Sequence, residues 1–135
     1  MIVVNTDGSC KPNPGKAGCG YVIVVDGTTL EEGSVYLGEG TNNIAELKAV
    51  EVALEALLKL ELQEQSIELQ TDSAYAIGLF TKNWKAKANT ELVMKIREDL
   101  KKFPKLGFSW VKGHNGSHYN ELADKLANQA IDMAN

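Results

Sequence analysis

The chain has 135 residues, of which 44% are hydrophobic and 24% are charged, so we expect one soluble globular domain over residues 1–135. Its net charge of −4 argues against a protein that coats nucleic acid through its overall charge. Two cysteines, Cys10 and Cys19, are too few for a disulfide framework, and no apolar run approaches the roughly 18 residues of a membrane span. We therefore expect a cytoplasmic protein without a membrane segment.

The first forty residues predict three strands that form an antiparallel meander. Residues 1–6 and 19–25 are rich in β-branched side chains, and residues 30–38 alternate between apolar and polar side chains. A loop rich in proline, glycine and asparagine separates the first two strands. Asp26 and Gly27 then mark a hairpin turn before the third.

The rest of the chain alternates between helices and strands. Apolar residues recur at helical spacing after residue 41, and Ser73 is a good capping residue for a second helix. The helices are predicted at 41–62, 73–82, 89–103 and 117–133, and the strands at 66–71 and 108–113. Strands four and five follow helical crossovers, so we expect them to run parallel to the first strand. The predicted fold class is α/β, with a five-stranded mixed sheet (three antiparallel strands, then two parallel) and about four helices.

Charge is distributed unevenly along the chain. Residues 82–112 carry nine bases and three acids, a net charge of +6, whereas the remaining residues carry five bases and fifteen acids, a net charge of −10. A basic segment in an acidic protein is typical of a surface that faces a polyanion. A solvated helix face explains the charges equally well, so charge alone leaves both interpretations open.

Four acids occupy positions where a shared site could form. Asp7 closes the first apolar run and Asp72 closes the fourth strand, and ligands of such sheets bind beyond the carboxyl ends of the parallel strands. Glu46 and Asp124 lie on the first and last helices, where a helix-dipole acid and an exposed acid are the alternatives. Clustered carboxylates repel, so they hold protons or bind a hard cation such as Mg²⁺ or Mn²⁺. Two such ions about 4 Å apart can promote phosphodiester cleavage.

Four blocks of sequence resemble the signature blocks of type 1 ribonuclease H, in the same order and at similar spacing. They are TDGSCKPNPGKAGCGYV, TNNIAELKAV, LQTDSAYAI and WVKGHNGSHYNELADKLA. The resemblance covers essentially the whole chain. It implies the ribonuclease H-like fold and metal-dependent endonucleolytic hydrolysis of the RNA strand of an RNA–DNA hybrid, leaving 5′-phosphate and 3′-hydroxyl ends. The family fold is self-contained, so we expect a monomer.

The resemblance also implies roles for individual residues. Asp7 would bridge two Mg²⁺ ions, for which Mn²⁺ can substitute, with Glu46 and Asp72 on one ion and Asp124 on the other. His114 matches a loop histidine that assists proton transfer or product release, and an imidazole that titrates near neutrality suits either task. Taken alone, His114 would be an exposed loop residue.

Substrate contacts carry over from the same blocks. Asn13 matches a residue near the minor groove of the hybrid, and Thr41 and Asn43 match residues that hold the DNA strand, although TNN can also simply cap the long helix. Gly8 and Ser9, which follow Asp7, and Glu46 itself are the expected readers of the RNA 2′-hydroxyl groups.

The chain departs from the well-studied bacterial enzymes in one segment. Their basic protrusion, an extra helix and loop, is absent or severely shortened, because only KNWKAKANT joins Phe80 to the next helix. Phe80, Asn83 and Trp84 match substrate-facing positions, although Trp84 could instead pack on the sheet edge. Val93 and Ala74 replace a tryptophan and a glutamine of the family. A non-catalytic nucleic-acid binding module is the alternative function, and the presence of all four carboxylates favours the enzyme.

Overall fold

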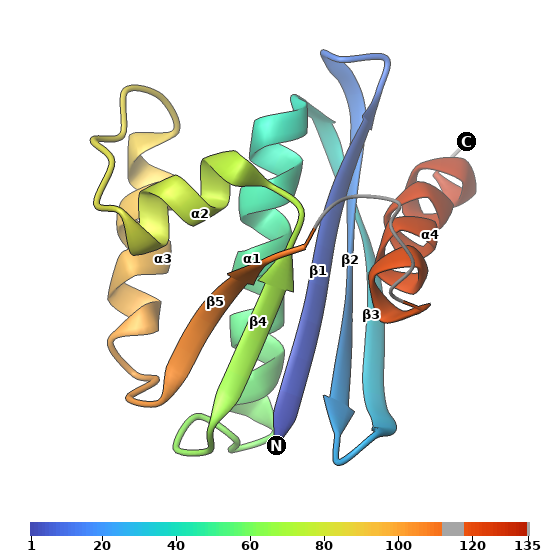
Figure 1. Ribbon diagram of the computed structural model, residues 1–135. Helices are drawn as coiled ribbons and strands as arrows, with labels where there is room; N and C mark the ends of the chain where they lie inside the picture. The colour runs from blue at the N-terminus through green and yellow to red at the C-terminus, as the bar shows by residue number, and fades with distance from the viewer. Residues whose placement is uncertain (112–117, 135) are drawn as a thin grey trace.

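The computed structural model describes residues 1–111 and 118–134 and has the predicted order of elements (Figure 1). The strands are β1 (Ile2–Lys11), β2 (Gly15–Val25), β3 (Thr28–Gly40), β4 (Ile67–Thr71) and β5 (Leu106–Trp110). The helices are α1 (Asn42–Lys59), α2 (Ala74–Thr81), α3 (Thr90–Leu100) and α4 (His118–Met133).

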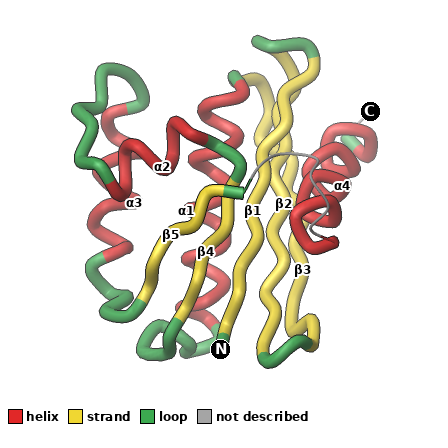
Figure 2. The backbone as a smooth tube through the Cα atoms, in the orientation of Figure 1, coloured by secondary structure: helices red, strands yellow, loops and turns green. Residues whose placement is uncertain are grey.

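The five strands form one mixed sheet in the order β3-β2-β1-β4-β5 (Figure 2). β1 pairs antiparallel with β2, and β2 pairs antiparallel with β3. The hairpin turn at Asp26 and Gly27 joins β2 to β3. β4 pairs parallel with both β1 and β5. This arrangement confirms the predicted fold class, three antiparallel strands followed by two parallel ones.

Helices pack on both faces of the sheet, as two consecutive residues of β2 show. Val22 belongs to an apolar cluster with Ala123 and Leu126 of α4, whereas Ile23 belongs to the main core with residues of α1. Because neighbouring side chains of a strand point to opposite faces, α1 and α4 must cover opposite faces of the sheet. Figure 1 shows α4 over the antiparallel strands and away from the three other helices.

The helix starts follow the predicted caps. The Thr41 hydroxyl accepts the N–H of Ile44 at 3.2 Å, and the Ser73 hydroxyl accepts the N–H of Ala76 at 3.1 Å. Each bond satisfies one of the N–H groups that a helix start leaves open. α3 begins at Thr90, and Asn89 before it has a φ of 55° and makes no side-chain capping bond.

One boundary differs from its prediction in a way that matters for the site. The first strand does not end near Asp7 but continues to Lys11, because β1 remains paired with β2 through Lys11↔Lys16. Its pairing with β4 stops earlier, at Thr6↔Thr71. Asp7 therefore lies inside a strand, at the point where the neighbouring parallel strand ends.

Residues 82–89 join α2 to α3 and contain no helix, which agrees with the shortened segment expected from the sequence. The indole of Trp84 lies against Gly78 of α2, where a β-carbon would overlap the ring. Arg97 of α3 donates to the carbonyls of Leu79 and Trp84 and ties this connection to the helices. In the described part of the chain, no helix is long and apolar enough to cross a membrane.

Candidate active site

Asp7 and Asp72 lie side by side because of the strand register. The last parallel pair of β1 and β4 is Thr6↔Thr71, so Asp7 and Asp72 are the next residue of each chain segment. Adjacent strands are about 4.8 Å apart, and the chain turns into α2 directly after Asp72, with Ser73 as the cap. The sequence predicted this meeting, although it placed Asp7 at a strand end.

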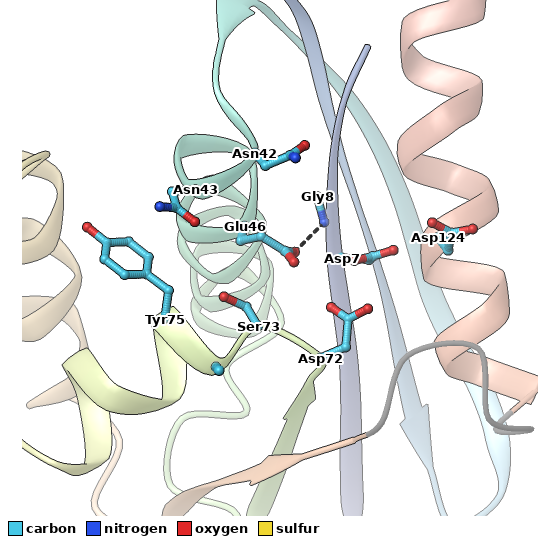
Figure 3. A pocket seen from close by; sticks show the side chains of 10 residues that line it. Asp7, Gly8, Asn42, Asn43, Glu46, Asp72, Ser73, Tyr75 and Asp124 are labelled. Carbon is cyan, nitrogen blue, oxygen red and sulfur yellow. Dashed lines mark hydrogen bonds between the residues drawn. The ribbon is translucent and has the colours of Figure 1, made fainter. Parts of the chain in front are cut away.

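Gly8 lets α1 bring Glu46 to the same place. A β-carbon at Gly8 would overlap the backbone of Ala45 and Glu46, so only glycine allows this close approach of helix and strand. The N–H of Gly8 donates to the Glu46 carboxylate at 2.6 Å (Figure 3). The bond fixes Glu46 toward Asp7 and Asp72.

Asp124 reaches Asp7 from the opposite face of the sheet, on α4. Two glycines of β2, Gly18 and Gly20, lie under this helix, and a β-carbon at either would come within 2.6 Å or less of a carbonyl oxygen of α4. The helix can therefore lie close to the sheet. Figure 3 shows Asp7 with Glu46 on one side and Asp124 on the other.

The four acids place several carboxyl groups close together. Asp7 is only 4% exposed, and burial, then Glu46, Asp124 and Asp72, raise its pKa far above the ordinary carboxyl value. Burial and Asp72 likewise raise the pKa of Glu46, although the Gly8 N–H opposes the change. Within residues 1–111 and 118–134, none of the four acids forms an ion pair with a lysine or arginine. Such a cluster favours protons or a bound cation.

The donor set suits a hard divalent cation. Ligand atoms of Asp7, Glu46 and Asp72 all lie within 4.8 Å of one another. One carboxylate oxygen of Asp72 is buried and has no hydrogen-bond partner among the described residues. Oxygen ligands without histidine or cysteine are those that Mg²⁺ and Mn²⁺ prefer. Asp124 lies outside this triad but lines the same pocket of about 370 Å³.

Three of the residues expected to contact the hybrid line a pocket next to that of the acids. Asn13, Thr41 and Asn43 line a neighbouring pocket, and Asn43 lines the acid pocket as well. The side-chain oxygen of Asn13 accepts the N–H of Asn42 at 3.1 Å, so the first loop buttresses the start of α1. Thr41 has the capping role that the sequence offered as an alternative.

The remaining predicted residues are spread more widely. Phe80 stacks on Phe108 of β5 with ring centroids 5.7 Å apart, in a different part of the molecule from the acid pocket. Trp84 is 46% exposed, and Asn83 precedes it with a φ of 55°. Ser9 donates its hydroxyl to Asn128. His114 lies outside the described residues.

Tyr75, like Asn42, lines the acid pocket but was not singled out from the sequence. It lines the acid pocket, the pocket with Asn13 and Thr41, and a third pocket formed with Trp84, Lys85 and Lys87. Figure 3 shows its ring beside Asn43, with the hydroxyl directed away from the acids. Its place in the first turn after the Ser73 cap was the available signal.

Comparisons with known proteins agree on one family. The family model for RNase H matches residues 1–132. Ribonuclease H of Actinobacillus pleuropneumoniae is 37% identical, over 94% of this chain and 88% of the relative, and Ribonuclease H of Clostridium botulinum is 37% identical over 99% and 97%. Among solved structures, LC11-RNase H1 in complex with RNA/DNA hybrid superposes with a TM-score of 0.89 at 36% identity, covering 99% of both chains. RNase H1 of Halobacterium salinarum gives 0.87 at 33% identity, covering 98% of both. From the family model and these relatives, this chain belongs to the ribonuclease H family.

Proposed function

We propose that this chain hydrolyses the RNA strand of RNA–DNA hybrids in a reaction that depends on a divalent cation. The observation that carries the proposal is the meeting of Asp7, Glu46 and Asp72 within 4.8 Å, in a pocket where no described base neutralises them. The related LC11-RNase H1, whose fold is nearly superposable, is known in complex with an RNA/DNA hybrid.

Asp7, Glu46, Asp72 and Asp124 would hold Mg²⁺, with Asp7 shared between two ions. Bound there, the ions would activate water and stabilise the charge that develops on the phosphate and the leaving oxygen, giving 5′-phosphate and 3′-hydroxyl ends. The protein supplies the placement. β1 and β4 fix two carboxylates by register, and the Gly8 N–H holds the third.

The start of α1 forms the adjoining surface for the substrate. Asn42 and Asn43 are exposed there and line the acid pocket, and helix starts attract phosphate through free N–H groups and the helix dipole. Asn13 and Thr41 hold this start in position. Gly8 and Ser9, beside the carboxylates, are the proposed readers of the 2′-hydroxyl groups. His114 is proposed to assist proton transfer or product release.

The basic segment divides into two parts with different functions. On α3 and just after it, Lys95, Lys101 and Lys102 pair with acids of the protein itself. Lys85 and Lys87 are exposed, form no ion pair with described residues, and line a pocket with Tyr75 and Trp84. We propose that these two lysines contact the hybrid, as point charges in place of the missing basic protrusion.

The test is cleavage of an RNA–DNA hybrid labelled on its RNA strand, beside RNA–RNA and DNA–DNA duplexes of the same sequence. Each is incubated with Mg²⁺, with Mn²⁺ and with EDTA. We expect cuts in the RNA of the hybrid alone, and only with a cation. Binding of the hybrid without cleavage under any of these conditions would contradict the proposal and favour the alternative, a non-catalytic nucleic-acid binding module.

A further inference from the structure

One face of β1 carries the contacts that hold α4. Asp7 and Ser9 are two residues apart, so their side chains project from the same face of the strand, and both are buried. Asp124 and Asn128 are four residues apart, so they lie on the same side of α4. Asp7 interacts with Asp124, and Ser9 interacts with Asn128.

The second of these pairs is a short hydrogen bond. The hydroxyl of Ser9 donates to the side-chain oxygen of Asn128 at 2.7 Å. Two residues of strand advance the chain by about 6.6 Å, and four residues of helix advance it by about 6 Å. A bond between Ser9 and Asn128 therefore brings Asp124 level with Asp7.

The two positions of β2 that pair with Asp7 and Ser9 carry no side chain, although Val22 and Val24 of the same strand pack against Ala123 and Leu126 of α4. Gly20 is the β2 partner of Asp7, and Gly18 is the partner of Ser9. Both lie directly under the helix backbone and present no side chain that could interlock with it. Close packing on glycine brings the helix near the sheet, but it resists sliding and rotation less than interdigitated side chains do.

We propose that Asn128 is a positioning residue, which sets the height and rotation of α4 through Ser9 so that Asp124 faces Asp7 and the site binds its cation tightly. The inference rests on the proposed function, because it concerns the cation of that site. Asn128 itself does not line the acid pocket. It acts through Asp124, as groups that orient metal ligands do.

The molecule contains a matched control. The hydroxyl of Ser34 on β3 donates to the backbone carbonyl of Leu126 on α4, also at 2.7 Å. This bond ties the same helix to the sheet, but through β3. In the sheet, β3 is an edge strand, and β2 separates it from β1, which carries Asp7. Removing either bond should loosen α4 to a similar extent, whereas only the loss of the Asn128 bond should move Asp124 away from Asp7.

The experiment measures Mg²⁺ binding by calorimetry without substrate, together with the rise in Tm that Mg²⁺ produces. We expect Asn128→Ala to bind Mg²⁺ about tenfold more weakly than the wild-type chain, and Ser34→Ala to bind like the wild type. In metal-free buffer the two variants should lose similar amounts of Tm. Ser9→Ala should reproduce Asn128→Ala, the double variant should be no weaker than either, and Ser9→Thr, which keeps the hydroxyl, should bind like the wild type.

The possible failures are distinguishable. Equal Mg²⁺ binding by the wild-type chain and Asn128→Ala would overturn the positioning role and leave the proposed function intact. Equal weakening by Asn128→Ala and Ser34→Ala would overturn it too, since any loosening of α4 would then suffice. A wild-type chain that binds no Mg²⁺ would overturn the proposed function and this inference together.

Discussion

Two of the acids of helix α1, Glu46 and Glu51, lie five residues apart and have completely different surroundings. Glu51 is 6% exposed, and its carboxylate pairs with Lys48 at 3.1 Å and with Lys95 at 3.2 Å. Glu46 meets the carboxyl groups of Asp7 and Asp72 and one backbone N–H. The fold therefore gives Glu51 two lysine partners, whereas it places Glu46 among other carboxyl groups.

The difference separates a structural cluster from a candidate binding site. Lys95 of α3 reaches Glu51, Glu55 and Asp99 within 3.5 Å, so the acids between α1 and α3 are neutralised by side chains of the protein. At the end of the parallel strands the charges remain unbalanced among the described residues. A fold that tolerates such repulsion gains from a ligand that removes it. Acid content alone would not distinguish these two regions.

The largest expected effect is on cleavage, and it should appear when a charge is removed from the acid cluster but not when one is removed from the neutralised region. We expect Asp7→Asn to lower the rate of hybrid cleavage on the order of a thousandfold, because the charge that is shared between the proposed ions is lost while the volume is kept. Glu51→Gln makes the same kind of charge change in the neutralised region and should leave kcat near its original value. Steady-state cleavage at saturating Mg²⁺ measures both, and comparable losses in the two variants would contradict the distinction.

The pH dependence of stability should also differ between the two regions. The pKa values of Asp7 and Glu46 are raised in the folded chain, so without a metal the folded state holds protons that the unfolded chain has released above pH about 4. The contribution of these two acids to the free energy of unfolding should therefore be largest below that pH and should fall as the pH rises toward their folded pKa values. We expect a loss of about 2 kcal/mol or more by pH 8, measured by urea unfolding in EDTA.

Two additions to that experiment isolate the acid cluster as the cause. Asp7→Asn should be more stable than the wild-type chain at pH 8 without metal and should show a flatter pH dependence, because one raised carboxyl is gone. Mg²⁺ should restore stability to the wild-type chain and have less effect on the variant. If Asp7→Asn were less stable than the wild-type chain at pH 8 in EDTA, repulsion could not be the dominant effect of the acid cluster on stability.

Removing the central lysine of the neutralised region should have the opposite effect. It should lower the free energy of unfolding and leave cleavage nearly unchanged. Lys95→Met keeps most of the aliphatic side chain but removes the cation shared by Glu51 and Asp99, two buried acids. We expect a loss of about 1–2 kcal/mol in the free energy of unfolding, since Lys48 and Lys102 still reach these acids. Cleavage by the folded variant should be unchanged, and a loss of kcat at full folding would show that the two regions are coupled.

The sequence predicted the acid cluster well because its members follow elements with strong local signals. Asp72 comes directly after a short apolar strand and before a capping serine, and the parallel pairing of β4 with β1 then sets it beside Asp7. Periodicity could not show that β1 continues past Asp7, since pairing with β2 extends it through the polar residues that follow. Gly8, Gly18 and Gly20 allow α1 and α4 to pack close to the sheet. Nothing in the sequence distinguishes them from other glycines of loops and strands.

The basic segment shows what local patterns cannot reveal. Its nine bases looked equivalent in the sequence, yet Lys95 and Lys101 are paired with acids and Lys85 and Lys87 are not paired within the described residues. The pairs of Lys95 with Asp99 and of Lys101 with Glu98 follow helical spacing within the segment. The pairs of Lys95 with Glu51 and Glu55 depend instead on how α3 packs against α1, which the sequence pattern does not show. Phe80 illustrates the same limit, because its stacking on Phe108 depends on where β5 lies.

The smallest expected effect tests this division of the lysines. Lys85→Ala and Lys87→Ala should each raise KM for the hybrid a few fold and reduce by about one the slope of log affinity against log salt concentration, because each removes one phosphate contact. Lys101→Ala also removes an exposed charge, but one that is already paired with Glu98 at 2.9 Å, and it should leave both quantities unchanged. Hybrid binding of inactive Asp7→Asn, measured by fluorescence anisotropy at several salt concentrations, gives the slopes directly. Equal slopes for all three lysine variants would mean that the hybrid responds to the overall charge of the segment, and that the pocket formed with Tyr75 and Trp84 does not select the bases that contact it.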